Sequence, residues 1–487
     1  MIFSLNMANP IFILLVGIVI VVGGIIGFKL HPFLALLLAA VAVALLTPVA
    51  SVEQFFLSKG IAADEALKLS HKSIGERIGT EFGSTCAKVG ILIAMAAIIG
   101  KSMLDSGAAE KIIRAMLKIT GEKNAPVGFM LSSFFLTIPV FVDTVIFLMM
   151  PLAKAMGMRL GKNYLLLALS VIAGAVMANS YVPPSPGPLF LVAAMNVPIG
   201  LMMACGAMLG LCTITVGYFV ARWLNKKMPI PLRDSPDARL EDIAAIANKT
   251  DKELPSLGWA LLPAVFPLVT ICIRSAVEAF TKPNTAVTDS LVLNKILDVV
   301  LFFGDKNIAM LMGAIFALLV LAKQTKTTKG KLTAFVQTAL MTGGGIILIT
   351  ASGGAFGGML QQSGISQSIA NATKDYQMAL IPLAFLITAI VRTAQGSATV
   401  ALITASGILA GMAQNANLGF HPVYLCLAIG SGAKLIPWMN DAGFWIACKT
   451  TNLTEREALK TIAPMQSIMG IAGVLLTMLA AWLFPMV

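Results

Sequence analysis

The chain has 487 residues, of which 57% are hydrophobic and only 12% are charged, and its formal net charge is +12. Because soluble domains carry about 25% charged residues, this composition excludes an ordinary soluble protein and predicts a polytopic membrane protein. A basic surplus of this kind is typical of the cytoplasmic loops of membrane proteins, so we favour that interpretation over nucleic-acid binding.

The first half of the chain contains several apolar runs that are typical of membrane-spanning helices. They predict spanning helices at residues 11–28, 32–47, 89–104 and 199–221. Two other stretches, residues 51–82 and 108–118, place charged residues between apolar positions. This pattern predicts amphipathic helices that lie in the membrane interface rather than cross it.

Residues 126–156 form an unusual apolar segment. Its two arms, residues 127–136 and 145–155, are each too short to cross a bilayer, and the stretch from Thr137 to Asp143 lies between them. A re-entrant hairpin whose tip stops at mid-membrane explains this pattern better than a straight helix.

The next predicted helix, over residues 164–195, is interrupted by four prolines between Pro183 and Pro188. Proline removes a backbone donor and cannot continue a helix, so this helix must break. Backbone carbonyls freed in lipid are costly unless protein, water or a ligand satisfies them. The break therefore predicts a cavity or a binding site at mid-membrane.

The second half repeats the plan of the first. It has predicted spans at 257–279, 308–321, 343–360 and 462–484, a two-armed segment at 378–412 and a broken helix at 421–449. One offset in residue number relates Gly107 to Gly364, which end matching helices, and also Pro183 to Asn440, which lie in matching breaks.

The expected fold is thus an all-α polytopic membrane protein built from two inverted-topology repeats, residues 1–221 and 257–487, joined by a cytoplasmic loop at residues 222–256. Each repeat would contain about five crossings, one re-entrant hairpin and one broken helix, and an odd number of crossings inverts the second repeat.

Loop charge provides an independent test of this topology. If residues 222–256 are cytoplasmic, several lysine-rich stretches share that side: 111–123, 154–162, 226–227, 323–331 and 449–460. The loops placed on the opposite side, at 196–198, 361–377 and 413–419, contain almost no Lys or Arg. The positive-inside rule therefore supports the inverted arrangement and predicts that both termini are periplasmic.

Two hairpin tips and two helix breaks would converge near the midplane, where the N-termini of half-helices favour an anion. Arg392 lies at the second tip, where a buried charge marks a functional residue. We assign it to a substrate carboxylate, which a guanidinium can bind bidentately. The alternative is a structural ion pair with Asp143 or Asp441.

Other residues of the tips and breaks are candidates for binding hydroxyl groups of the substrate or for allowing close backbone approach. These substrate-binding candidates are Thr393, Gln395, Gly396, Ser397, Thr399, Ser185, Pro183, Asn440 and Thr137.

Asp143 and Asp441 are the acids best placed to carry a proton or to line a cation site, and the alternative role for each is to cap a half-helix. Lys434 would lie deep in its helix, where it compensates Asp441 or contacts the anion. Its alternative is a stem that extends to the membrane surface.

The sequence contains no pattern that indicates an enzyme. The six cysteines and three histidines are scattered and predict no metal site, and neither GxSxG nor HExxH occurs. Glycine pairs such as 353–354 lie in apolar helix and indicate close packing rather than a phosphate loop. We therefore expect no catalytic residue, no cofactor and no metal.

Six strings in chain order resemble the gluconate permease family of gluconate:proton symporters in the ion-transporter superfamily. They are FGST at 82–85, GKSMLDSG at 100–107, IPVFVD at 138–143, VPPSPGP at 182–188, RTAQGSATV at 392–400 and NDAGFW at 440–445.

The resemblance implies a bacterial inner-membrane symporter for gluconate or a related sugar acid or hydroxy acid. It also implies proton coupling, a homodimer and an elevator-like motion. The alternatives are a sodium-coupled carrier of carboxylates or D-amino acids, and a cation/proton antiporter. The chain departs from the family pattern at four positions: Asp143 replaces a usual Glu, Ser185 a usual His, Lys434 an uncharged residue and Ala442 a usual Ser.

Overall fold

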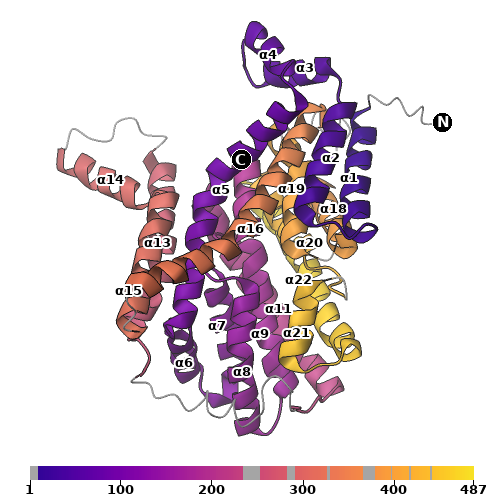
Figure 1. The fold of residues 1–487 in the computed structure, drawn as a ribbon. Helices are drawn as coiled ribbons and strands as arrows, with labels where there is room; N and C mark the ends of the chain where they lie inside the picture. The colour runs from indigo at the N-terminus through magenta and orange to yellow at the C-terminus, as the bar shows by residue number, and fades with distance from the viewer. Residues whose placement is uncertain are drawn as a thin grey trace.

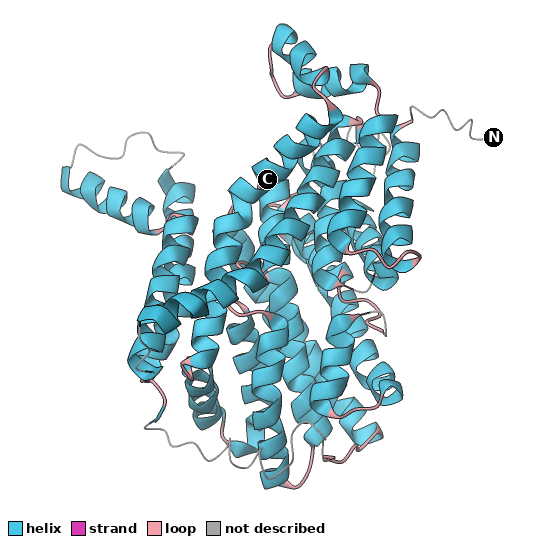
Figure 2. Cartoon of the chain, viewed as in Figure 1, coloured by secondary structure: helices cyan, strands magenta, loops and turns pink. Residues whose placement is uncertain are grey.

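The computed structural model describes residues 9–233, 253–281, 291–325, 329–365, 379–395, 397–415, 418–438 and 441–486. Within these ranges the chain consists of helices joined by loops and turns, without strands (Figure 2). Seven of the described helical stretches are long and apolar enough to cross a membrane, or eight if one bent pair counts as a span. The all-α polytopic fold predicted from the sequence is confirmed.

The first half begins with short helices and continues with longer ones. These are α1 (Pro10–Ile26), α2 (Pro32–Leu46), α3 (Val49–Ser58), α4 (Ala63–Ser70), α5 (Ile74–Asp105), α6 (Ala108–Thr120), the 3-10 helix η1 (Glu122–Asn124), α7 (Ala125–Thr137), α8 (Val142–Leu160), α9 (Tyr164–Tyr181), α10 (Pro186–Met195) and α11 (Ile199–Lys227).

The second half continues with further helices. These are α13 (Leu257–Thr281), α14 (Leu291–Phe303), α15 (Lys306–Thr325), α16 (Lys329–Gln362), α18 (Leu380–Gln395), α19 (Ala398–Asn415), α20 (Val423–Gly432), α21 (Ala442–Thr451) and α22 (Glu455–Leu483).

Both predicted helix breaks are present. The first separates α9 from α10, and Pro183 and Pro184 lie inside it while Pro186 begins the new helix. The second separates α20 from α21. The two-armed segments are the pairs α7–α8 and α18–α19, and α5 and α16 both end before a glycine in the left-handed region, Gly107 with φ +74° and Gly364 with φ +80°.

The N-terminal third differs from its prediction in one respect. Residues 51–82 are not a single interfacial helix, because α3 and α4 are separate and α5 already begins at Ile74. A capping box causes this early start: the Glu76 backbone N–H donates to Ser73 Oγ at 3.2 Å, and the Ser73 backbone N–H donates to Glu76 Oε2 at 3.0 Å.

In the second half, the helix α14 was not predicted from the sequence.

The helix α9 is buried along almost its whole length and packs against α7, α8 and α11. Gly174 makes the contact with α7 possible, since a Cβ there would lie 2.1 Å from the Met130 carbonyl oxygen. At the end of α9, Gly206 of α11 similarly approaches the Tyr181 carbonyl, at 2.2 Å from an added Cβ. The break after Tyr181 is therefore held within closely packed helices.

Helices from the two halves interlock. The helix α5 packs against α15 and α16, α10 packs against α19, and α11 packs against α22. Figure 1 shows α3 and α4 at one end of the molecule and α6 with the end of α8 at the other, while α13 to α15 lie on one flank. The first break is buried, whereas the second is buried at Ala433 and Lys434 but exposed at Ile436 and Trp438.

Candidate functional site

A cavity of about 150 Å³ lies where the second break meets α8, α9, α18, α19 and α22. The residues that line it are Val142, Asp143, Ile146, Ile172, Val176, Asn179, Arg392, Ser397, Ala398, Thr399, Lys434, Asp441, Gly443, Ala447 and Gln466. It thus brings together side chains from both halves of the chain. The cavity also brings Asp143 together with three charged residues that lie far from it in the sequence, Arg392, Lys434 and Asp441.

Three helices begin at this cavity. Val142 is the first residue of α8, Ala398 is the first of α19, and Gly443 is the second of α21, and all three line the cavity wall. The first turn of a helix carries backbone N–H groups without intrahelical partners and the positive end of the helix dipole. Asp441 caps α21, and the Ser397 hydroxyl accepts a hydrogen bond from the Val400 backbone N–H at 3.4 Å. The helix α8 has no side-chain cap, so the N–H groups of its first turn favour an anion in the cavity.

Arg392, in the last turn of α18, is 2% exposed. Its Nη2 forms an ion pair with Asp441 Oδ2, and its Nε donates a hydrogen bond to the Ala433 carbonyl at 3.0 Å. Of the two structural ion pairs considered for Arg392, the one with Asp441 is therefore present. The guanidinium nevertheless lines the cavity, so the pair holds it there.

Asp441 also caps a helix, as its alternative role predicted. Asp441 is the N-cap residue of α21, and its Oδ1 accepts a hydrogen bond from the Gly443 backbone N–H at 2.8 Å. One carboxylate oxygen thus caps α21 and the other pairs with Arg392. This arrangement fixes Asp441 as the link between the end of α18 and the start of α21.

Lys434 follows α20 and is 2% exposed, so its stem does not extend to the surface. Its side chain lines the cavity within electrostatic reach of Arg392 and Asp441. Among the described residues it makes no hydrogen bond or ion pair. A buried ammonium without a partner needs a counter-charge, which an anion in the cavity would supply.

Asp143 lies in the first turn of α8 and is an exposed residue on the cavity wall. Within the described part of the chain its carboxylate has no hydrogen bond or ion pair. Counted as ionised groups, Arg392 and Lys434 carry two positive charges, and Asp143 and Asp441 carry two negative ones. A bound monocarboxylate would make this site negative, and one added proton would restore neutrality.

The remaining predicted site residues fall into three groups. Ser397 and Thr399 line the cavity at the start of α19. Thr393, Thr137, Ser185 and Pro183 do not line it. The Gln395 side chain, Gly396 and Asn440 lie outside the described residues.

The residues outside the cavity have structural contacts instead. The Thr393 carbonyl accepts a hydrogen bond from Trp438 Nε1 at 2.9 Å. The Ser185 hydroxyl donates to the Thr137 carbonyl at 3.3 Å, and the Thr137 hydroxyl donates to the Ser133 carbonyl at 2.7 Å. A hydrogen bond therefore connects the proline break to the end of α7.

Two polar residues of the cavity were missed from the sequence. Asn179 of α9 and Gln466 of α22 are each 7% exposed and line the wall. Their signal is an amide in an otherwise apolar helix, and Asn179 lies four residues before Pro183. Amides at these points add donors and acceptors that suit a hydroxylated ligand. No cluster of three or more potential metal ligands occurs among the described residues.

Comparison with known proteins gives a consistent result over the whole chain. A family model described as GntP family permease matches residues 9–483. A gluconate permease of Pseudomonas aeruginosa is 27% identical over 478 residues, covering 97% of this chain and 98% of that protein. The inner membrane permease YgbN of Escherichia coli is 28% identical over 472 residues, covering 96% and 97%.

Among solved structures, MtrF of Neisseria gonorrhoeae superposes with a TM-score of 0.60. The match covers 83% of each chain at 16% sequence identity. At this identity the similarity shows a shared fold.

Proposed function

Because this chain belongs to the GntP family of permeases and is therefore a transporter rather than an enzyme, we propose that it imports a small organic anion, gluconate or a related sugar acid, by proton symport. It is a multi-pass protein of the inner membrane. The observation that carries the proposal is the cavity where Arg392 and Lys434 meet three helix N-termini.

The substrate carboxylate is assigned to the space between Arg392 and Lys434. The ion pair with Asp441 orients the guanidinium, while Lys434 needs a counter-charge. The substrate hydroxyls are assigned to polar side chains around the same cavity. These are Ser397, Thr399, Asn179 and Gln466.

Asp143 is the proposed proton carrier. Unlike Asp441 it is not engaged in an ion pair within the described residues, and it faces the cavity. A protonated Asp143 leaves the site with a net positive charge that matches a monocarboxylate. A proton moving down one pH unit supplies about 1.4 kcal/mol, enough for about tenfold accumulation.

The proposed transport cycle is elevator-like and rests on inverted repeats. The paired breaks, the paired two-armed segments and the matching glycine ends support this symmetry. In this proposal both termini are periplasmic, and the working form is a homodimer.

Uptake by purified protein in proteoliposomes tests the function. We expect gluconate to accumulate when the outside is acidic, and a protonophore should abolish accumulation while exchange of labelled for unlabelled gluconate continues. Sodium gradients and D-amino acids are the comparison arms. Accumulation driven by sodium at constant pH, or accumulation of D-amino acids without sugar acids, would contradict the proposal.

A further inference from the structure

A second cavity, of about 280 Å³, lies at the end of the molecule that carries α3. It is lined by residues of α3, α5, α10, α16 and α19, and we call it the outer cavity. It is separate from the cavity lined by Arg392 and Lys434, which we call the central cavity. Helix α19 connects the two: its first residues line the central cavity, whereas Gly407 and Ala410 line the outer one. From Thr399 to Gly407 the helix rises about 12 Å.

One face of α5 supplies the polar wall. Glu81, Ser84, Thr85 and Lys88 all line the cavity, and their spacing of three, four and seven residues puts them on one side of a helix. Glu81 and Lys88 are two helical turns apart, about 10 Å along the axis. A six-carbon acid is long enough to contact the carboxylate at one end and the ammonium at the other.

The Glu81 carboxylate is held in place by a buried polar chain. Arg77 Nε donates to Gln362 Oε1 at 2.8 Å, and Gln362 Nε2 donates to Glu81 Oε1 at 3.3 Å. Arg77 is 6% exposed and Gln362 is 1% exposed. Within the described ranges Glu81 Oε2 accepts no hydrogen bond, so this oxygen remains for a hydroxyl group in the cavity.

Glycines of α16 give this polar face its room. A Cβ at Gly358 would lie 2.5 Å from Glu81 Cγ, and one at Gly354 would lie 1.9 Å from Thr85 Oγ1. Only glycine at these positions lets α5 approach α16 closely enough for Glu81 to reach Gln362. The cavity wall thus depends on a specific helix contact.

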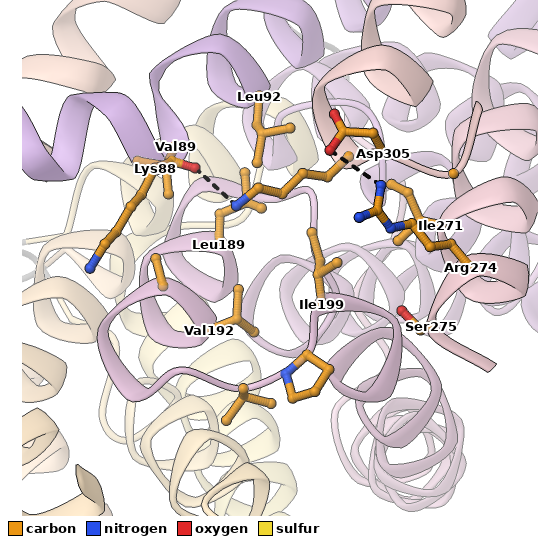
Figure 3. A pocket seen from close by; sticks show the side chains of 15 residues that line it. Lys88, Val89, Leu92, Leu189, Val192, Ile199, Ile271, Arg274, Ser275 and Asp305 are labelled. Carbon is orange, nitrogen blue, oxygen red and sulfur yellow. Dashed lines mark hydrogen bonds and ion pairs between the residues drawn. The ribbon is translucent and has the colours of Figure 1, made fainter. Parts of the chain in front are cut away.

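Lys88 contributes the positive charge. Figure 3, which shows the neighbouring cavity between α5 and α13, places the Lys88 amino group away from Arg274 and Asp305. Those two form their own ion pair at 3.5 Å. In the described structure the Lys88 side chain has no hydrogen bond or ion pair, and it lies within electrostatic reach of Glu81 and Lys59.

We propose that this outer cavity is a second binding site for the same polyhydroxy carboxylate, which binds there before it reaches the central cavity. Lys88 binds the substrate carboxylate, with Lys59 adding to the positive field, and Glu81 accepts hydrogen bonds from substrate hydroxyls. This inference rests on the proposed function, because it takes its ligand from the same substrate class.

Packing between the two cavities separates the sites. A Cβ at Gly187 of α10 would lie 2.3 Å from Leu402 Cδ1 of α19, so these helices are in close contact between the outer and the central residues of α19. Substrate transfer then requires α10 and α19 to move apart. The proline break before α10 provides a point at which this movement can occur.

Calorimetric titration of the purified full-length protein with gluconate tests the second site. The variants are Glu81→Gln and Lys88→Gln, and the matched controls are Glu65→Gln and Lys68→Gln, which change the same charges on exposed positions of α4. Hexanoate, an acid without hydroxyls, and sorbitol, a polyol without a carboxylate, separate the two proposed contacts.

We expect two gluconate molecules per chain in the wild type and in both controls, and one in Glu81→Gln and Lys88→Gln. Glu81→Gln should leave hexanoate binding unchanged, whereas Lys88→Gln should weaken it about tenfold. In transport, both variants should raise KM for gluconate about tenfold without lowering kcat.

The outcomes distinguish this inference from the proposed function. A single gluconate site that is weakened in Arg392→Lys and unchanged in Glu81→Gln and Lys88→Gln would overturn the outer site and leave the central one. Absence of gluconate binding in the wild type would overturn both. Two sites that both survive Glu81→Gln and Lys88→Gln would also overturn the outer site.

Discussion

Arg392 and Lys434 bring two positive charges to one buried cavity, and among the described residues Arg392 forms an ion pair whereas Lys434 does not. Asp441 pairs with Arg392 and at the same time caps α21, so its charge is already committed. A buried charge without a partner is strongly destabilising. In the proposed function, Lys434 therefore supplies the attraction for an anion, and Arg392 supplies the fixed geometry.

Replacement of Arg392 by lysine tests its contact with the carboxylate. Lysine keeps the charge but loses the planar fork, so binding of sugar acids should weaken by about tenfold or more, while binding of matched neutral polyols should change little. Competition binding with gluconate and sorbitol on the purified variant measures this difference. Equal losses for acid and polyol would show that Arg392 acts only through the packing of α18 and α21.

Replacement of Asp143 by asparagine tests the proton carrier. Asparagine keeps the shape of the side chain but cannot titrate, so the variant should exchange gluconate across the membrane without accumulating it in response to a pH gradient. Proteoliposome uptake with and without an imposed gradient measures both activities. Asp441→Asn serves as the comparison, since losing the partner of Arg392 should weaken binding itself. Accumulation that persists in Asp143→Asn would exclude this residue as the carrier.

At the scale of helices, the proline break makes packing contacts in this structure. The Ser185 hydroxyl donates a hydrogen bond to the Thr137 carbonyl, and Gly187 packs on Leu402. Neither Pro183 nor Ser185 lines the central cavity. The His that the family resemblance implies at position 185 would thus change contacts with the end of α7 in this chain. The second break, in contrast, contributes Lys434 and Asp441 directly to the cavity.

The contact between α7 and α9 can be tested through Gly174. In Gly174→Ala the new methyl group would lie 2.1 Å from a backbone carbonyl, which cannot move away without shifting α7. Overpacking of this kind costs about 1–3 kcal/mol, so we expect a lower thermal unfolding temperature in detergent. Gly79→Ala is the control, because a Cβ added at Gly79 of α5 would meet no described atom within 4 Å apart from its chain neighbours and its own helix backbone. Equal unfolding temperatures for both variants would contradict the close α7–α9 contact.

The helices and breaks were predictable because proline, glycine and apolar runs act locally. Gly107, Gly364 and the prolines from 183 to 188 each impose a local backbone restriction that is visible in the chain. Partners across the cavity were not predictable in the same way. Arg392 had two candidate acids, and only the fold shows that Asp441 is the one in contact. Asn179 and Gln466 were missed because a single amide in an apolar helix does not indicate the direction in which it points.

At the scale of the molecule, the two halves share one core. Helix α5 packs on α16, and α11 packs on α22. Each cavity is lined by helices from both halves of the chain. Helix α19 lines both cavities. The last turns of α6, α8 and α11 are basic, because they contain Lys118, Arg159 and Lys227. The positive-inside rule predicts that these ends face the cytoplasm.

Helix α11 offers a direct test of the proposed orientation. Its 29 residues span about 44 Å, which exceeds the roughly 30 Å hydrocarbon core of a bilayer, and it is apolar enough to cross, so we expect its two ends on opposite sides. Asn196 precedes it and Lys226 lies in its last turn, and both are exposed, whereas Ala413, another residue of the expected outer face, is 9% exposed and unsuited to labelling.

In a cysteine-free background, Asn196→Cys should react with a membrane-impermeant maleimide added to spheroplasts, and Lys226→Cys should react only after the membrane is permeabilised. The physical reason is the positive-inside rule, since the Lys226 end is basic and the 196–198 turn is not. Glu65→Cys on α4 is a further reporter for the outer face, because α3 and α4 lie at the end opposite to α6 (Figure 1). Labelling of Lys226→Cys from outside, with Asn196→Cys protected, would reverse the orientation and place the outer cavity on the cytoplasmic side, where it would receive substrate only on release.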